Sequence, residues 1–280
     1  MHKERDTSKL FAEILKYLVL VIACLLVILP LAVVFLGSFK THRDYLTSGI
    51  FELPKEWRFE NYTTAFIRGN VLTGLKNTGI ILLFTCAGSL MLGSMAAFVI
   101  QRFDTLLSRI VKGAFLVAML MPGIAMQVTV FRIVDTLGLY DTLAAPIVLG
   151  IGTDIISLYL FMQYLSQISV SIDESAIVDG ASYPRIYFSI ILPLLSPAMI
   201  TVLLMKFIAV YNDFYTANLY MPSERLGVVS TALYRFMGPY GSKWEIIFAG
   251  IIICVIPTLV VFLSLQKYIY SGLVRGAIKE

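Results

Sequence analysis

The sequence carries little charge for its length. Asp, Glu, Lys and Arg make up 14% of its 280 residues, whereas 58% of the residues are hydrophobic. A soluble domain has roughly 25% charged residues. Because the deficit extends over the whole chain, it excludes a soluble globular protein and predicts a polytopic membrane protein. The net charge of +4 is small, and the basic residues lie at the ends of apolar runs, so we expect no nucleic-acid partner.

Residues that catalysis and metal binding require are also scarce. The three cysteines, Cys24, Cys86 and Cys254, each lie in an apolar run, and none forms a Cys-x-x-Cys pair. The pattern therefore predicts neither a disulfide framework nor a metal site. The two histidines, His2 and His42, lie outside the apolar runs. We find no G-x-x-x-x-G-K-[ST] phosphate loop, no H-E-x-x-H and no nucleophile elbow, so we expect no catalytic residue and no cofactor on this chain.

Six apolar stretches are long enough to cross a bilayer, for which a helix needs about 20 mostly apolar residues. The first three are bracketed by Lys16 and Lys40, by Lys76 and Arg102, and by Lys112 and Arg132; they contain 23, 25 and 19 uncharged residues. The other three are expected at about 142–163, 190–211 and 246–265. The fold class is therefore predicted to be all-α, with six transmembrane helices.

Local signals add detail to these spans. Pro30 predicts a kink in the first span, and Met121-Pro122-Gly123 predicts a break in the third. Ser89, Gly93 and Ala97 follow each other at four-residue spacing, which favours close helix packing in lipid. Between the first two spans, a surface helix is expected at about 59–66, with Trp57 at the membrane interface.

The segment 171–197 is unusually polar for its surroundings. Ser171 and Glu174 have the S-x-x-E spacing of a capping box, and Gly180 is expected to end the helix that they begin. Pro184 suits the first turn of a second short helix. The segment is predicted to form a helix, a glycine elbow and a helix on the membrane surface. A linker that joins two spans for purely structural reasons is the alternative interpretation.

The same segment carries a family resemblance. Glu174-Ser175-Ala176, then Gly180, then Ile190-x-Leu192-Pro193 follow the pattern E-A-A-x3-G-x9-I-x-L-P. This pattern resembles the coupling loop of the membrane subunits of ABC importers, which have the MetI-like transmembrane fold. Ser175 replaces the usual alanine, and both side chains are small. The runs ELPKEWRFENYTTAF, AAFVIQRF, LYDT and QKYIYSGLVRGAIKE extend the resemblance over nearly the whole chain, to the MalG-type permeases of carbohydrate importers.

The resemblance implies a domain plan, a function and partners. It implies an anchor helix and extracytoplasmic segment at 1–71, a transmembrane domain at 72–268 with a cytoplasmic coupling loop at 171–189, and a cytoplasmic tail at 269–280. The chain would import a di- or oligosaccharide across the bacterial cytoplasmic membrane by alternating access, with both termini in the cytoplasm. Its partners would be a second, MalF-like permease, two copies of a cytoplasmic ATPase that binds ATP and Mg²⁺, and an extracytoplasmic sugar-binding protein. The residues implied in ATPase coupling are Glu174, Ser175, Ala176, Asp179, Gly180, Ala181 and Pro193.

Polar residues within spans are costly in lipid and are candidates for the translocation path. These candidates are Gln127, Asp154, Lys206, Tyr211, Asn212 and Asp213. Each has a structural alternative. Lys206 could pair with Asp154 or contact the partner subunit, and Gln127 could satisfy backbone groups freed at Pro122. Residues 211–213 resemble a polar stretch of the family that is expected to serve in packing or gating.

Two other functions are compatible with parts of the sequence. An ABC importer of glycerol phosphate or another polar solute would share these motifs, but a phosphate site needs several basic residues within the spans, and only Lys206 lies there. A self-sufficient secondary transporter often has inverted repeats or several intramembrane carboxylates. We see no repeat, and Asp154 is the one clear carboxylate.

Overall fold

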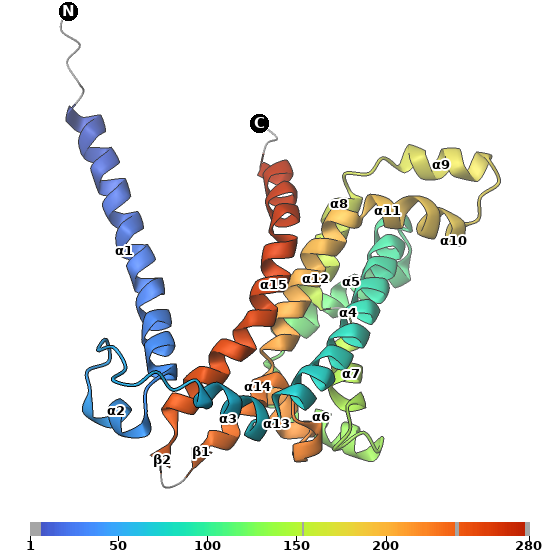
Figure 1. Ribbon diagram of the computed structural model, residues 1–280. Helices are drawn as coiled ribbons and strands as arrows, with labels where there is room; N and C mark the ends of the chain where they lie inside the picture. The colour runs from blue at the N-terminus through green and yellow to red at the C-terminus, as the bar shows by residue number, and fades with distance from the viewer. Residues whose placement is uncertain (1–6, 153, 239–240, 278–280) are drawn as a thin grey trace, which may run out of the picture. The chain divides into compact units, whose positions relative to one another are not determined.

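The structure is a computed structural model that describes residues 7–152, 154–238 and 241–277. The described residues are mostly helical, and two short strands, β1 (Met237–Gly238) and β2 (Gly241–Ser242), form one antiparallel pair (Figure 1). The chain forms two compact units, one of Met1–Asn70 with Leu233–Ile256 and the other of Val71–Ala232 with Pro257–Glu280. Each unit is described below by itself.

Among the described residues, length and apolar composition give six spans when each bent helix pair is counted as one span. Three single helices in this part of the chain are long and apolar enough to cross a membrane, α1 (Thr7–Ser38), α4 (Val71–Arg102) and the part of α15 (Trp244–Ala277) up to Ser264. Three helix pairs meet the same test together, although each pair is bent by more than 40°. The predicted all-α, six-span fold is thereby confirmed.

The first unit contains α1, α2 (His42–Thr47), α3 (Glu60–Arg68), a 3-10 turn at Leu233–Phe236 and the first part of α15. The side chains of α1 up to Leu31 that the structure describes are exposed, as expected of a helix whose solvent is lipid. The helix continues through Pro30. The surface helix predicted at 59–66 is α3, where Ala65 packs against Ile246 and Ala249.

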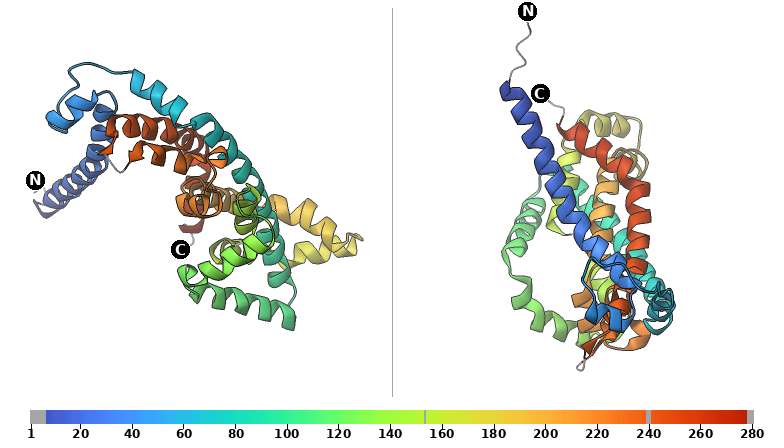
Figure 2. Two further views of the ribbon diagram at one scale, coloured as in Figure 1. Left: turned by 90° about the horizontal axis from the view of Figure 1, so that it is seen from below. Right: turned by 60° about the vertical axis from the view of Figure 1, so that its left-hand side comes forward.

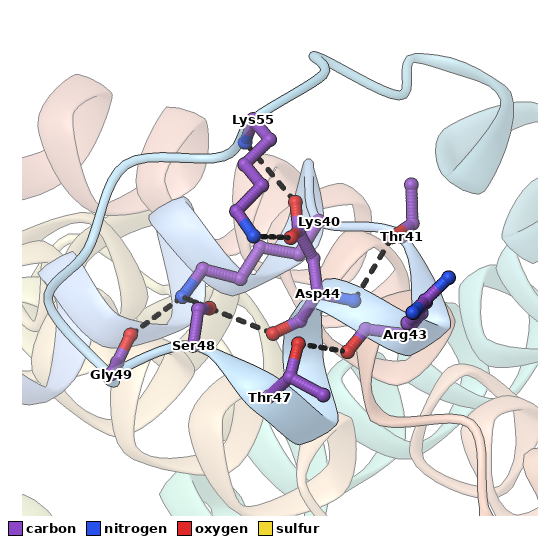
Figure 3. Close-up of polar contacts among 8 residues, drawn as sticks. All are labelled: Lys40, Thr41, Arg43, Asp44, Thr47, Ser48, Gly49 and Lys55. Carbon is purple, nitrogen blue, oxygen red and sulfur yellow. Dashed lines mark hydrogen bonds and ion pairs between the residues drawn. The ribbon is translucent and has the colours of Figure 1, made fainter.

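A buried lysine organises the segment that follows α1. Lys40 is only 2% exposed, and its Nζ donates to Ser48 Oγ at 2.8 Å and to the Gly49 carbonyl at 2.7 Å. The Asp44 carboxylate accepts from the Lys55 backbone N–H at 3.1 Å. Figure 3 shows that these contacts hold both ends of the loop between Gly49 and Lys55 against the residues around α2.

The second unit is built around α4. This helix packs against α7 (Ala144–Ile151), α8 (Ile155–Leu165) and α12 (Ser196–Tyr211). Ser89, Gly93 and Ala97 are all buried on it, as their spacing predicted. Gly88 allows an even closer approach, because a Cβ atom there would lie 2.0 Å from Ile151 Cγ1.

The third span breaks where the sequence predicted. α5 (Leu106–Leu120) and α6 (Gly123–Thr136) flank Met121-Pro122 and differ in direction by 109°. Figure 2 shows the chain turning sharply between these two helices, which are drawn in green.

Two further spans are broken at positions that were not predicted from the sequence. The fourth span was expected to be continuous over 142–163, but α7 and α8 meet at 41° because the Asp154 side chain caps a new helix. The fifth span was expected to start near Ile190. Instead, a helix of three parts, α10 (Tyr183–Ile186), a π-helical turn (Tyr187–Ile191) and α11 (Leu192–Leu194), meets α12 at 74°. Pro197 lies in the first turn of α12, where its missing N–H and fixed φ favour a helix start over continuation.

The remaining elements of this unit are short. They are α9 (Val170–Val178), α13 (Phe214–Tyr220), a 3-10 turn at Glu224–Leu226, and α14 (Val229–Ala232). The helix α15 runs to Ala277, through most of the range that was expected to be a tail. Lys279, part of the resemblance at the chain end, lies outside the described residues.

We predict that Lys40→Met loosens the loop between Gly49 and Lys55. The substitution removes donors to Ser48 and Gly49, and hydrogen bonds from charged groups contribute about 1.5–3 kcal/mol each. Chymotrypsin should then cleave the detergent-purified protein after Phe51 faster than it cleaves the wild type. Lys55→Met is the matched control, because the Lys55 side chain is 75% exposed and its Nζ lies 3.8 Å from Asp44. Equal cleavage rates for both variants would show that Lys40 does not hold the loop.

Candidate functional site

The polar segment 171–197 forms a projecting helical hairpin. Figures 1 and 2 show α9 and α10 side by side, joined by a loop that lies away from the rest of the unit. The start of α9 differs from the prediction. Its N-cap is Ser169, whose Oγ accepts from the Ser171 N–H at 3.3 Å. The expected capping box of Ser171 and Glu174 was wrong, because the helix begins before Ser171 and leaves that residue inside it.

The end of α9 follows the prediction. Gly180 has a φ of +79°, the left-handed conformation that glycine adopts without steric cost. The Ala181 N–H donates to the Ala176 carbonyl and the Gly180 N–H to the Ile177 carbonyl, both at 2.9 Å. These two bonds form a Schellman motif. Pro184 then lies in the first turn of α10, so the predicted sequence of helix, glycine elbow and helix is confirmed.

The hairpin has an exposed side and a buried side. Glu174, Ser175, Asp179 and Gly180 are exposed, and the apolar Val178 beside them is 87% exposed. A Cβ atom built on Gly180 would meet no atom within 4 Å. Among the other motif residues, Pro193 is exposed, Ala181 is half-buried and Ala176 is buried. Glu174, Ser175, Val178, Asp179 and Gly180 thus form one exposed surface, which we call the elbow surface.

The buried side of α9 is fixed by an ion pair that sequence reasoning missed. Arg102 Nε lies 2.6 Å from Asp173 Oδ2, and the two side chains are 6% and 8% exposed. Arg102 Nη2 also donates to the Ile168 carbonyl at 3.0 Å. Arg102 ends α4, and Asp173 precedes the family motif. Both charges were visible in the sequence, but nothing in it indicated that two such distant residues meet.

Among the candidates within spans, Asp154 and Lys206 come together. Lys206 Nζ lies 3.1 Å from Asp154 Oδ2 and 3.5 Å from the Gly152 carbonyl. Asp154 Oδ1 accepts from the Ser157 N–H, and Oδ2 accepts from the Ser157 hydroxyl, each at 2.8 Å. Of the two alternatives given for Lys206, the pair with Asp154 is therefore present. Asp154 and Lys206 also satisfy two backbone groups at the break between α7 and α8, the Ser157 N–H and the Gly152 carbonyl.

The other candidates take part in local packing. Tyr211 is buried and stacks on Phe207, with ring centroids 5.6 Å apart. The Asn212 amide donates to the Ile208 carbonyl at 3.0 Å, and the Asp213 carboxylate caps α13 by accepting from the Thr216 N–H at 2.9 Å. Asp213 also lines a cavity of about 120 Å³ that includes Thr78, Thr216 and Val228.

Gln127 is half-buried on α6, in the second turn after Pro122.

Two carboxylates outside the spans are held ionised by their neighbours. Hydrogen bonds from Arg109, at 2.8 and 2.6 Å, lower the pKa of Asp104 in the exposed turn between α4 and α5. Hydrogen bonds from the Ser223 hydroxyl and N–H lower the pKa of Asp141 in the turn between α6 and α7. Because both pKa values are lowered, the two carboxylates are ionised and these contacts persist at neutral pH. The contacts are lost as the pH falls through the lowered pKa values of Asp104 and Asp141.

We predict that the Asp154–Lys206 pair is energetically coupled. Asp154→Asn keeps the helix cap but removes the negative charge that faces Lys206, and Lys206→Met removes the positive charge that faces the Asp154 carboxylate. Each single variant should unfold at a lower temperature in lipid nanodiscs. The double variant should recover part of the loss, with a coupling energy of about 1–3 kcal/mol. Additive effects would contradict the coupling. Asp104→Asn, which breaks an exposed pair, is the control and should change little.

Comparison with known proteins agrees with the observed fold. Residues 89–275 match the family described as the inner membrane component of binding-protein-dependent transport systems. The chain is 30% identical over 264 residues to the probable starch degradation products transport system permease protein AmyC of Thermoanaerobacterium thermosulfurigenes, covering 93% of this chain and 94% of the relative. It is 30% identical over 281 residues to the trehalose/maltose transport system permease protein MalG of Thermococcus litoralis, covering 95% and 98%.

A further relative and a solved structure agree with these matches. The melibiose/raffinose/stachyose import permease protein MelC of Bacillus subtilis is 28% identical over 269 residues, covering 95% of this chain and 96% of the relative. A crystal structure of a bacterial ABC transporter involved in the import of the acidic polysaccharide alginate contains a chain with the same fold. The TM-score is 0.83 at 21% identity, over 96% of this chain and 99% of that chain. The chain described here therefore belongs to the family of inner-membrane permease components of binding-protein-dependent ABC transport systems.

Proposed function

We propose that this chain is the permease subunit of an ATP-driven importer that moves a di- or oligosaccharide across the cytoplasmic membrane. The observation that carries the proposal is the elbow surface, which is exposed and acidic at a glycine turn, beside transmembrane helices that contain no nucleotide loop. ATP and Mg²⁺ would be bound by a separate ATPase, present in two copies. A second, MalF-like permease and an extracytoplasmic sugar-binding protein would complete the assembly.

The substrate class is supported by the relatives and by charge. The curated relatives above are named for starch degradation products, trehalose and maltose, and melibiose, raffinose and stachyose. A phosphorylated solute would favour uncompensated cationic groups within the spans. Lys206, the lysine of the fifth span, is paired with Asp154. This pairing favours an uncharged sugar over glycerol phosphate.

The elbow surface suits a groove on the ATPase. Gly180 presents backbone without a side chain, so a partner can approach closely, and Glu174 and Asp179 can pair with basic residues beside the groove. Val178 adds an apolar contact at the centre of this surface. In the proposed orientation, the hairpin and both termini lie in the cytoplasm.

Transport would follow from alternating access. ATP binding would draw the two ATPase subunits together, and each would carry a coupling hairpin with it. The helices that follow the hairpins would then tilt and open the path to the outside, and hydrolysis would reset them. Residues 211–213 lie at a turn between α12 and α13, where they could serve in gating.

The assembly can be tested by affinity purification of the tagged chain in mild detergent from its own host. We expect a protein with a G-x-x-x-x-G-K-[ST] loop and a second polytopic permease to co-purify, as identified by mass spectrometry. Recovery of the chain alone in several mild detergents would refute the importer. It would favour a self-contained transporter in which Asp154 and Lys206 take part in transport.

We predict that Gly180→Asp uncouples transport without unfolding the spans. The substitution adds bulk and negative charge at the proposed contact, in a turn where φ is +79°. Sugar uptake should fall at least about tenfold, with the ATPase lost on purification and the amount of protein in the membrane unchanged. Gly180→Asn has the same size without the charge, and asparagine tolerates this φ, so the pair of variants separates bulk from charge.

Ser175→Ala, which restores the usual family residue on the same exposed helix, is the control and should transport normally. Normal uptake by a well-expressed Gly180→Asp variant would contradict the predicted contact.

A further inference from the structure

The buried side of the hairpin is attached to α4 through both of its arms. On the first arm, Arg102 of α4 binds Asp173 at 2.6 Å and the Ile168 carbonyl at 3.0 Å. On the second arm, the Tyr187 hydroxyl is hydrogen bonded to Ser94 Oγ at 2.7 Å. Aromatic contacts add to this attachment, with ring centroids 5.5 Å apart for Phe98 and Tyr187 and 4.9 Å apart for Phe103 and Tyr183. The hairpin and this end of α4 should therefore move together.

The Arg102–Asp173 pair is better suited to fixing position than to adding stability. Both charges lose their hydration on burial, and an apolar pair of similar size would often stabilise a fold as well. A shift of the helices would leave either buried charge without its counterion, a penalty that an apolar pair does not impose. Arg102 combines a charge contact to Asp173 with a hydrogen bond to the Ile168 carbonyl. These two contacts tie the position of α9 to the end of α4.

The opposite end of α4 is also attached by polar contacts. The Asn77 amide donates to the carbonyls of Arg225 and Gly227, at 3.2 and 3.0 Å, and Thr78 Oγ1 accepts from the Val229 N–H at 3.0 Å. A Cβ atom on Gly74 would lie 3.2 Å from the Val228 carbonyl carbon, so the backbones are close. α4 is thus joined by hydrogen bonds to the segment 225–229 as well as to the hairpin.

α4 is suited to connect these two ends. It is one continuous helix without proline, and at 1.5 Å per residue Asn77 and Arg102 lie about 38 Å apart along it. The other three spans that fall within residues 71–232 are bent pairs, with angles of 109°, 41° and 74°. A continuous helix transmits a displacement of one end to the other, whereas a bent pair can absorb it at the break.

We propose that Arg102 is a positioning residue that clamps the coupling hairpin to α4, so that α4 carries the movement of the hairpin to the segment 225–229. This inference rests on the proposed function, in whose orientation the segment 225–229 faces the outside. ATP binding at one membrane face would thereby change the surface offered to the binding protein at the other.

The test uses the purified transporter complex in nanodiscs, with ATP, Mg²⁺ and vanadate as the probe. Hydrogen–deuterium exchange of the amides of residues 223–229 is measured with and without the probe. In the wild type we expect the exchange rate to change about fivefold or more. In Arg102→Gln the change should be abolished, although the ATPase still co-purifies and still hydrolyses ATP.

Matched variants separate positioning from folding. Arg109→Gln removes an arginine from the neighbouring turn that pairs with the exposed Asp104, and it should behave as the wild type. The exchanged pair R102D/D173R should regain part of the response that either single substitution loses. Asn77→Leu, at the far end of α4, should abolish the response while leaving the binding of the ATPase intact.

The outcomes distinguish this inference from the proposed function. A wild type that carries no ATPase would refute the importer itself. A wild type that carries the ATPase but shows no change of exchange at residues 223–229 would overturn the transmission through α4 and leave the importer standing. A coupled wild type together with an Arg102→Gln variant that responds normally would overturn the role of Arg102 alone. Loss of the ATPase from Arg102→Gln would also overturn it, since the arginine would then support docking instead of transmission.

Discussion

The hydrocarbon interior of a membrane offers no water to backbone groups, and this constraint decides where the helices of this protein can break. Each break leaves N–H and C=O groups that the protein itself must satisfy. At the break between α7 and α8, Asp154 accepts from the Ser157 N–H and Lys206 donates to the Gly152 carbonyl. The two side chains also compensate each other's charge, so one pair of residues makes a bent span tolerable in lipid.

The contrast between α4 and its neighbours follows from the same constraint. α4 contains small residues instead of breaks, and buried Ser89, Gly93 and Ala97 let other helices pack closely against it. The neighbouring spans bend at Pro122, at Asp154 and between Pro193 and Pro197. The unit thus combines one continuous helix with three bent pairs, an arrangement that suits the proposed alternating access.

The exposed side and the buried side of the hairpin carry different residues. Glu174, Asp179 and Gly180 are exposed on the elbow surface, while Asp173 and Ala176 of the same helix are buried. One helix can therefore contact a partner protein on one side and the transmembrane helices on the other. The family motif covers mainly the exposed side, and the contacts that fix the hairpin come from Arg102, Ser94 and Tyr187, which lie outside the motif.

The class of fold, the number of spans, the break at Pro122 and the glycine elbow could all be predicted from the sequence. These features depend on local composition and on residues whose backbone preferences are strong, such as glycine at positive φ and proline at a helix start. The cap of α9 was predicted at Ser171 but lies at Ser169, because several serines nearby could serve and the local sequence does not select one. The bends at Asp154 and Leu195 were not predicted. The contacts of Arg102 with Asp173 and of Asn77 with the backbone of residues 225–227 could not be predicted either, because they depend on how distant helices pack, and no local preference encodes them.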